Sequence, residues 1–308
     1  MTSRSGSFAV KRLLSENRAQ FEREVEMLES FSGDGNPHLI SLLATYEQNN
    51  VFYLIFFWAE ADLQSFWRDV NPIPKRDYST VLWMAEQCLG IAKGLSALHN
   101  YTTFSHTRLK SVFGKSQPIH GNLSGIGECQ LFGVHGDIKP RNVLWYKDIS
   151  ENAGHGTLKI SDFGLAEFKT DPSEIYKPSE KVAYSASYRP PERDSKNAFV
   201  GRSHDIWALG CLYLEMIAWM LGGWQLVQNF QERRAPKGKF SRCEGVADAA
   251  FFHIESLSES GIATVAVKPA VTQADILPLV LNTADRASSS TTFATFQAAP
   301  SISIHFLI

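Results

Sequence analysis

Apolar and polar residues recur with two different periods along the first 58 positions. Residues 8–13 form a short, mostly apolar run typical of a strand, and residues 20–31 place apolar side chains on one helical face, at Phe21, Val25, Leu28 and Phe31. Two further apolar stretches, residues 39–46 and 51–58, are separated by a polar turn with hairpin character at residues 47–50. The pattern over residues 1–58 therefore predicts a small sheet with one helix.

Helical periodicity dominates the next part of the chain. Residues 81–99 carry apolar side chains at spacings of three and four, which favours a mostly buried helix. Residues 143–146 and 158–161 are predicted to be two short strands. Residues 205–221 are strongly apolar but shorter than the ~20 residues of a membrane span, so they are predicted to form a core helix. Residues 59–240 are thus expected to form a larger, helical second lobe.

Two regions lack a clear period. Residues 100–134 are polar and glycine-containing, which predicts a surface insertion. The pattern weakens beyond about Gln225, and residues 284–303 are rich in Ala, Ser and Thr. Residues 241–308 are therefore expected to be the degenerate end of the second lobe and a tail.

The charge balance narrows the possible partners. The chain has 30 basic and 32 acidic residues, a net charge of −2, and no long block of one sign. This argues against a nucleic-acid-binding stripe or a polybasic membrane patch. The four cysteines form no C-x-x-C pair, and there is no apolar run typical of a signal peptide. We expect a soluble protein of a reducing compartment, cytoplasmic or nuclear, whose oligomeric state the sequence leaves open.

The candidate chemistry is concentrated in two motifs. The first is H-G-D-I-K-P-R-N at residues 135–142, and the second is D-F-G at residues 162–164. Together they resemble the catalytic loop and the following metal-binding motif of eukaryotic-type protein kinases. The resemblance implies an α+β, two-lobed protein-kinase-like fold with a small β-rich N-lobe and a larger helical C-lobe.

The resemblance also implies a role for each residue of these motifs. Asp137 would accept the proton of the substrate hydroxyl, and Lys139 would lie beside the γ-phosphate of ATP. Asn142 and Asp162 would hold Mg²⁺, which prefers hard oxygen ligands. The implied activity is transfer of the γ-phosphoryl group of ATP to Ser or Thr hydroxyls of a protein substrate.

The nucleotide side of the site is expected in the N-lobe. Phe8-Ala9-Val10-Lys11 resembles the V-A-I-K strand, in which Lys11 would reach the α- and β-phosphates and Ala9 would lie over adenine. Glu24, thirteen residues later on the predicted helix, is the candidate partner of Lys11. The resemblance also places Phe57 and Ala59 in the linker at the adenine edge, preceded by Phe56, and adds Leu144 to the nucleotide site; Asp62 faces either ribose or solvent.

Three downstream segments extend the resemblance. Residues 185–192, S-A-S-Y-R-P-P-E, resemble the segment that closes the activation loop, with Ser185 in the place of the Thr that bonds the catalytic Asp and Lys. Asp205 begins a D-x-W-x-x-G motif, whose Asp would brace the catalytic-loop backbone. Arg286 would pair with Glu192. Residues 248–252 and 267–269 are similar to kinase sequences of filamentous fungi, whereas residues 119–123 only imitate a catalytic loop, because Asn122 cannot act as a base.

Two departures from the family pattern affect the expected activity. Only ten residues precede Lys11, with Gly6 as the one glycine among them, so we expect the first strand and the Gly-rich phosphate loop to be missing and ATP affinity to be low. Gly136 stands where most regulated kinases have the Arg that binds a phosphorylated loop. Phosphorylation of Ser173 or Ser179 is therefore expected to be unnecessary for activity, unless Arg141 or Arg189 supplies the charge.

Two other functions remain open at the level of sequence. A small-molecule kinase of the aminoglycoside or choline type also carries His-Gly-Asp followed by Asn, but usually has His at the position of Lys139 and lacks the P-P-E and D-x-W segments. A catalytically impaired pseudokinase, or a truncated kinase-fold binding module, would fit the missing phosphate loop. The presence of Lys11, Glu24, Asp137, Asn142 and Asp162 argues against an impaired pseudokinase.

Overall fold

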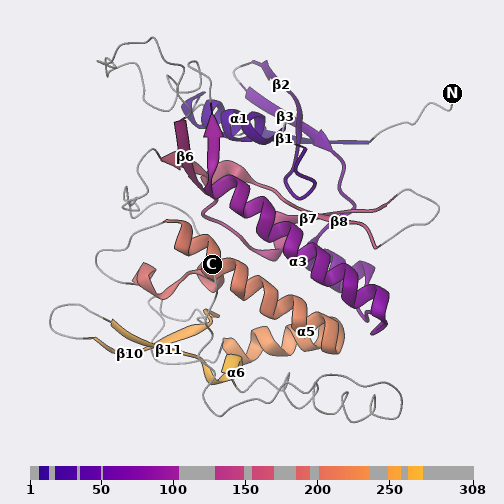
Figure 1. Cartoon of the computed structure of the whole chain (residues 1–308), viewed down its shortest axis with the longest axis vertical. Helices are drawn as coiled ribbons and strands as arrows, with labels where there is room; N and C mark the ends of the chain where they lie inside the picture. Colours follow the sequence, from indigo (N-terminus) through magenta and orange to yellow (C-terminus); the bar gives the residue numbers. More distant parts are fainter. Residues whose placement is uncertain are drawn as a thin grey trace.

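A small sheet with one helix forms the N-terminal part of the molecule. The computed structural model describes residues 7–13, 18–32, 35–49, 51–103, 129–148, 155–169, 185–194, 201–235, 249–257 and 263–272. Strands β1 (Phe8–Leu13), β2 (Leu42–Gln48) and β3 (Val51–Phe57) form an antiparallel sheet in the order β1-β3-β2, beside helix α1 (Arg18–Ser32) (Figure 1). The predicted strand, helix and hairpin are confirmed, with the hairpin's first strand beginning at Leu42 and not at residue 39.

Alternating burial along β3 explains how the sheet and α1 pack. Phe52, Leu54 and Phe56 are buried while their neighbours are partly or largely exposed, as expected for a strand with one face against the core. The ring of Phe21 on α1 stacks on Phe52 with centroids 4.4 Å apart. This packing holds α1 against the sheet.

The second lobe is built around two long helices. Helix α3 (Tyr78–His99) begins at Asp77, whose carboxylate accepts the Thr80 N–H at 2.9 Å, and helix α5 (Arg202–Arg234) lies beside it (Figure 1). Aromatic rings fill the space between them: the Phe66 ring lies 4.8 Å from Trp145 and 5.7 Å from Trp219. The kinase-like, two-lobed α+β architecture predicted from the motifs is therefore present.

Short elements connect these helices and carry the loops of the site. They are β4 (Ala61–Asp62), α2 (Leu63–Ser65), β5 (Tyr101–Thr103), β6 (Cys129–Val134), β7 (Val143–Tyr146), β8 (Thr157–Ile160) and β9 (Glu167–Lys169). Strand β7 pairs with β4 and β8, and β6 pairs with β5 and β9, all antiparallel. The pairings of β6 and β7 fix the two ends of residues 135–142 within the lobe.

Helix α5 contains the predicted core helix of residues 205–221 and continues beyond it after an interruption. Gly223, at φ 67° and ψ −166°, interrupts it, and the Trp224 N–H donates to Pro72 O at 2.8 Å at the same place. A Cβ at residue 223 would lie 2.3 Å from Pro72 O, so only glycine fits. By length and composition α5 is also the one helix of the described residues able to span a membrane, but 56% of its apolar stretch is buried inside the protein. The buried share supports the predicted core helix.

Two of the sequence expectations are corrected by the structure. Residues 100–134 are not wholly an irregular insertion, because β5 and β6 form its two ends by pairing with each other; residues 104–128 lie outside the described residues. The C-terminal region is not uniformly weak either. Strands β10 (Phe252–Leu257) and β11 (Ala263–Val267) form a hairpin, followed by helix α6 (Pro269–Thr272). This hairpin packs against α5, within the residues that were expected to be the end of the second lobe.

Candidate active site

A lysine and two carboxylates meet between the sheet and the second lobe. Lys11 Nζ lies 2.7 Å from Glu24 Oε1 and 2.7 Å from Asp162 Oδ1. The alternation of β1 directs Lys11 and Ala9 to the partly buried face of the strand, and Glu24 is buried on α1. The predicted pairing of Lys11 with Glu24 is confirmed. Asp162 joins the same cation from 151 positions away.

The charges of this group stabilise one another. Burial alone would lower the pKa of Lys11, but Glu24 and Asp162 raise it above its usual value. Burial opposes ionisation of Asp162 as well, yet Lys11 holds the pKa of that carboxyl below its usual value. Both groups are therefore charged at neutral pH.

A second polar group is formed by residues 137–142. Asp137 Oδ2 accepts hydrogen bonds from Lys139 Nζ at 2.5 Å and from Asn142 Nδ2 at 2.9 Å. Asn142 Nδ2 also donates to the backbone carbonyl of Asp137, and a short 3₁₀ turn, Pro140–Asn142, connects the three residues. Asp137 Oδ1 accepts no hydrogen bond from the part of the chain that the structure describes. It is the oxygen left for an external donor.

Asp205 holds the backbone that precedes Asp137. Its carboxylate accepts the N–H groups of His135 and Gly136, each at 2.8 Å, and lies 2.9 Å from His99 Nε2. Asp205 is almost completely buried, so these contacts replace its hydration. The predicted bracing role of Asp205 matches this geometry. His99, the third partner, was not found from the sequence, since a histidine at the end of an apolar helix gives no distinctive signal.

The position of Asp162 is fixed by the residue after it. Phe163 is 1% exposed, and its ring lies 6.2 Å from that of Phe31 on α1 and 5.1 Å from that of His135. Asp162 itself has a left-handed backbone, with φ 63°. This turn places the Phe163 ring in the core while the Asp162 side chain stays 48% exposed and reaches Lys11.

Ser185 lies where the sequence places it relative to Lys139. Lys139 Nζ donates to Ser185 Oγ at 2.8 Å, so one ammonium group contacts both Ser185 and Asp137. A direct bond between Ser185 and Asp137 was also expected, and the described residues show none. The lysine therefore connects the two side chains.

The residues predicted to contact adenine lie on the adjoining strands and linker. Ala9 pairs with Phe56 in the sheet, and Leu144 on β7 pairs with Asp62 on β4. Phe57 O accepts the Tyr146 hydroxyl at 3.3 Å, and Phe57 is 55% exposed. Ala59, between β3 and β4, is partly buried. The roles of these residues in binding adenine stay predictions.

Asp62 has a structural contact. Its two carboxylate oxygens accept the Ser65 N–H at 3.0 Å and the Ser65 hydroxyl at 2.8 Å. Asp62 is thus the N-cap of α2.

The two candidate sources of charge for a phosphorylated loop each donate a hydrogen bond to a neutral group within the described residues. Arg141 Nε donates to Gln64 Oε1 at 2.8 Å, and Arg189 Nη1 donates to Ala186 O at 2.6 Å. Ser173, Ser179, Arg286 and residues 119–123 lie outside the described residues. Glu192 Oε1 lies 3.9 Å from His204 Nδ1.

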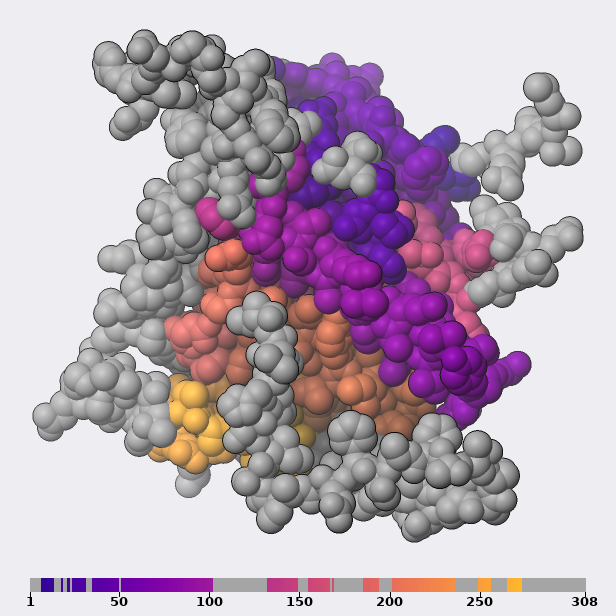
Figure 2. All heavy atoms as spheres, in the orientation of Figure 1, coloured from indigo at the N-terminus to yellow at the C-terminus, as the bar shows by residue number. Residues whose placement is uncertain are grey.

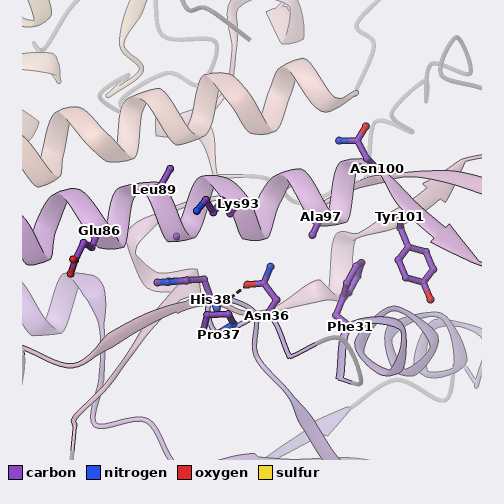
Figure 3. A pocket seen from close by; sticks show the side chains of 11 residues that line it. Phe31, Asn36, Pro37, His38, Glu86, Leu89, Lys93, Ala97, Asn100 and Tyr101 are labelled. Atoms are coloured by element: carbon purple, nitrogen blue, oxygen red, sulfur yellow. Dashed lines mark hydrogen bonds between the residues drawn. The ribbon is translucent and has the colours of Figure 1, made fainter.

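A pocket of about 590 Å³ lies away from this site, between the end of α1, the turn before β2, and α3 (Figure 3). His38 Nδ1 lies 2.8 Å from Leu158 O, and its ring lies over Gly90, where a Cβ would come within 2.3 Å of three ring atoms. Burial lowers the pKa of His38. Gly90 thus allows the turn to approach α3 closely.

Comparison with known proteins agrees with this geometry. Residues 129–234, which include the Asp137 loop, Asp162 and the Asp205 helix, match the protein kinase domain family model. This segment is therefore similar to protein kinase domains, as the motifs predicted. The match begins at β6, so it does not include the N-terminal sheet and α1. The ion pair of Lys11 with Asp162 connects that sheet to the matched residues.

Several protein kinases are similar to parts of the chain. The serine/threonine-protein kinase SSN3 of Yarrowia lipolytica is 25% identical over 188 residues, which are 59% of this chain and 36% of the relative. Cyclin-dependent kinase-like 2 of Rattus norvegicus is 38% identical over 96 residues, 31% of this chain and 17% of the relative. Human cyclin-dependent kinase-like 4 is 26% identical over 196 residues, 63% of this chain and 38% of the relative. The matched part of the chain thus spans less than two fifths of each relative.

The residues of the matched segment and of β1 fit ATP and Mg²⁺, which protein kinases use. Asp162 presents an ionised, half-exposed carboxylate, and Asn142 donates through Nδ2, which leaves its amide oxygen as a possible ligand. Both oxygens are of the hard type that Mg²⁺ prefers. Asn142 and Asp162 would hold the metal, which would neutralise phosphate charge, while Lys11 would contact the phosphates from the sheet.

Sequence reasoning did not identify Tyr188, Glu215 and Arg234. The Tyr188 hydroxyl donates to Glu215 Oε2 at 2.7 Å, and Arg234 Nη2 donates to Glu215 Oε1 at 2.6 Å. The sequence signal for Glu215 was a single charged residue within the strongly apolar residues 206–221, whereas Arg234 follows Glu232 and Arg233 in a polar stretch and gave no signal.

Proposed function

We propose that this chain transfers the γ-phosphoryl group of ATP to Ser or Thr hydroxyls of protein substrates. The observation that carries the proposal is the position of Lys139 Nζ, 2.5 Å from Asp137 Oδ2 and 2.8 Å from Ser185 Oγ. The ammonium group of Lys139 would neutralise charge on the transferred group. It contacts both the carboxylate base, Asp137, and Ser185 of the segment that closes the activation loop. Phosphoryl transfer requires mainly such positioning and neutralisation of charge.

Asp137 Oδ1, which accepts no hydrogen bond from the described residues, is the oxygen that would accept the substrate proton. Because Oδ2 is occupied by Lys139 and Asn142, the hydroxyl of the substrate would donate its proton to Oδ1. The hydroxyl oxygen would form the new bond to γ-phosphorus as the bond to the β-phosphate oxygen breaks. Lys139 would neutralise charge on the transferred group, and Lys11, held by Glu24, would do so on the remaining phosphates.

Radiolabel transfer tests this function directly. The 308-residue chain is incubated with γ-labelled ATP, Mg²⁺ and a basic protein, beside Asp137→Asn as the matched control, and the labelled amino acid is identified. We expect phosphoserine and phosphothreonine with the wild-type chain only. Labelled phosphotyrosine alone would contradict Ser/Thr specificity. Equal background label from both proteins, with ATP binding retained, would indicate a nucleotide-binding module instead.

A further inference from the structure

A buried ion pair connects the two halves of α5. Glu215 Oε1 and Arg234 Nη2 are 2.6 Å apart, and their side chains are 0% and 1% exposed. A straight helix would place residues 19 positions apart at ~28 Å. The contact exists because the chain reverses at Gly223, so that the second half of α5 returns along the first (Figure 1).

The same carboxylate holds the segment next to the proposed base. Glu215 Oε2 accepts the Tyr188 hydroxyl at 2.7 Å. Tyr188 is fixed to Ser185 by a 3₁₀ turn, in which the Tyr188 N–H donates to Ser185 O at 3.0 Å. Ser185 in turn accepts a hydrogen bond from Lys139. A continuous series of contacts therefore runs from Arg234 to the Lys139 and Asp137 pair.

Residues that flank the C-terminal hairpin, Phe251 and Lys268, contact Arg234. The guanidinium carbon lies 3.8 Å from the Phe251 ring centroid and 4.3 Å from that of Phe230, and Lys268 Nζ donates to Arg234 O at 2.7 Å. A buried ion pair is stable only when its remaining surroundings compensate for lost hydration. Phe251 and Lys268, on either side of the hairpin, supply part of that compensation.

The hairpin also touches the substrate-side segment itself. The Phe251 ring lies 6.2 Å from the Tyr188 ring, and the Arg189 guanidinium lies 5.2 Å from the Phe252 ring. Figure 2 shows the hairpin in yellow directly against residues 185–194 and α5. Asp137, Ser185, Tyr188 and Arg189 line one small pocket, so a residue beside the phosphorylated Ser or Thr would contact this segment.

We propose that Arg234 is a positioning residue for protein substrates, and that Phe251, whose ring covers the guanidinium, supports this role. Arg234 acts through Glu215 and Tyr188 to hold residues 185–194 beside Asp137. This inference rests on the proposed kinase function. Lys11 and Asp162 make none of the contacts in this series, so recognition of the protein substrate should depend on Arg234 while recognition of ATP should not.

Tyr188→Phe is the sharpest test, because it removes one hydroxyl and leaves the ion pair in place. Loss of a hydrogen bond to a charged group should raise KM for the protein substrate by about tenfold. KM for ATP should stay within about twofold. Val227→Ala is the matched control: Val227 is fully buried in the second half of α5, and its truncation should lower Tm without changing KM for the protein.

A double-mutant cycle identifies the route through Glu215. Tyr188→Phe and Arg234→Lys should have a smaller combined effect on KM for the protein than the product of their separate effects, because both loosen the same segment. Where Arg234→Lys does not fold, Phe251→Leu replaces it, since it removes the ring over the guanidinium and keeps the ion pair. Independent, multiplicative effects on KM would contradict the proposal.

The remaining outcomes separate this inference from the proposed function. An active wild-type chain whose KM for protein is unchanged in Tyr188→Phe would refute the positioning role alone. So would an equal rise in both KM values, or a rise in KM for the protein in Val227→Ala as large as that in Tyr188→Phe. A wild-type chain that transfers no phosphate would instead contradict the proposed function.

Discussion

Asp205 Oδ1 accepts a hydrogen bond from the backbone N–H of Gly136 at 2.8 Å, although the two residues are 69 positions apart. Gly136 has φ +82°, a left-handed conformation that residues with a Cβ resist. The carboxylate of a core helix thus stabilises an unusual backbone turn directly before Asp137. Glycine at residue 136 lets the turn form with little strain.

Gly136→Ala should therefore destabilise the domain by about 1–2 kcal/mol through its positive φ. The added Cβ would lie 3.4 Å from Leu165 O, so a clash contributes little. Gly136→Asn should cost less, since Asn tolerates this conformation better. Urea unfolding of the three proteins checks the order, and an Ala variant as stable as the wild type would contradict it.

Asp137→Asn should reduce kcat by a factor of about 10² or more, because an amide cannot accept the hydroxyl proton. Tm and ATP affinity should change little, since the substitution is isosteric. Asp69→Asn, a surface change beside Arg68, is the control and should retain full activity. Substantial phosphate transfer by the Asp137 variant would exclude this residue as the base.

Asp162→Asn should weaken ATP binding at least about tenfold in the presence of Mg²⁺, because one metal-binding carboxylate is lost. In EDTA the two proteins should bind ATP within about threefold of each other. Calorimetry under both conditions separates metal binding from a general effect on the cleft. An equal loss with and without Mg²⁺ would argue against Asp162 as a metal ligand.

Phosphatase treatment should leave phosphate transfer within about twofold of the untreated rate. Gly136 offers no cation to a phosphorylated loop, and Arg141 and Arg189 already contact Gln64 and Ala186. The assay compares treated, untreated and rephosphorylated protein. A tenfold loss that rephosphorylation between residues 165 and 189 restores would show that another residue binds the phosphate.

Stability should fall as the pH drops from about 6.5 towards 4, in part through His204. Burial, and then Arg193, lowers the pKa of this histidine to about 4, whereas an unfolded histidine titrates near ~6.5. In this interval the unfolded chain binds a proton at His204 that the folded chain does not. The stability contributed by the neutral, buried His204 is therefore present above pH 6.5 and lost towards pH 4. Thermal melting of the wild type and of His204→Phe at pH 7.5 and 5.0 checks this prediction. The Tm of the wild type should fall more between the two pH values than the Tm of the variant.

The sequence determined the elements and the motif residues. Periodicity predicted β1, β3, β7, α1 and α3 to within a few residues, because each buries one face against a core and its pattern records that burial. The motifs predicted the contacts of Lys11 with Glu24, Lys139 with Ser185, and Asp205 with the catalytic loop. Those contacts were implied by the resemblance of the motifs to protein kinases, since charge alone does not say which residues meet.

Only the tertiary structure decided how the C-terminal part is arranged. The reversal at Gly223 depends on the close approach of Pro72, and the Arg234 to Glu215 pair exists because of that reversal. Phe252 of β10 lies against the Trp207 ring of α5, and Phe251 before it lies against the Arg234 guanidinium and the Phe230 ring of α5. Such long-range packing leaves no period in a single stretch of sequence, because each partner alone is an ordinary apolar or charged residue.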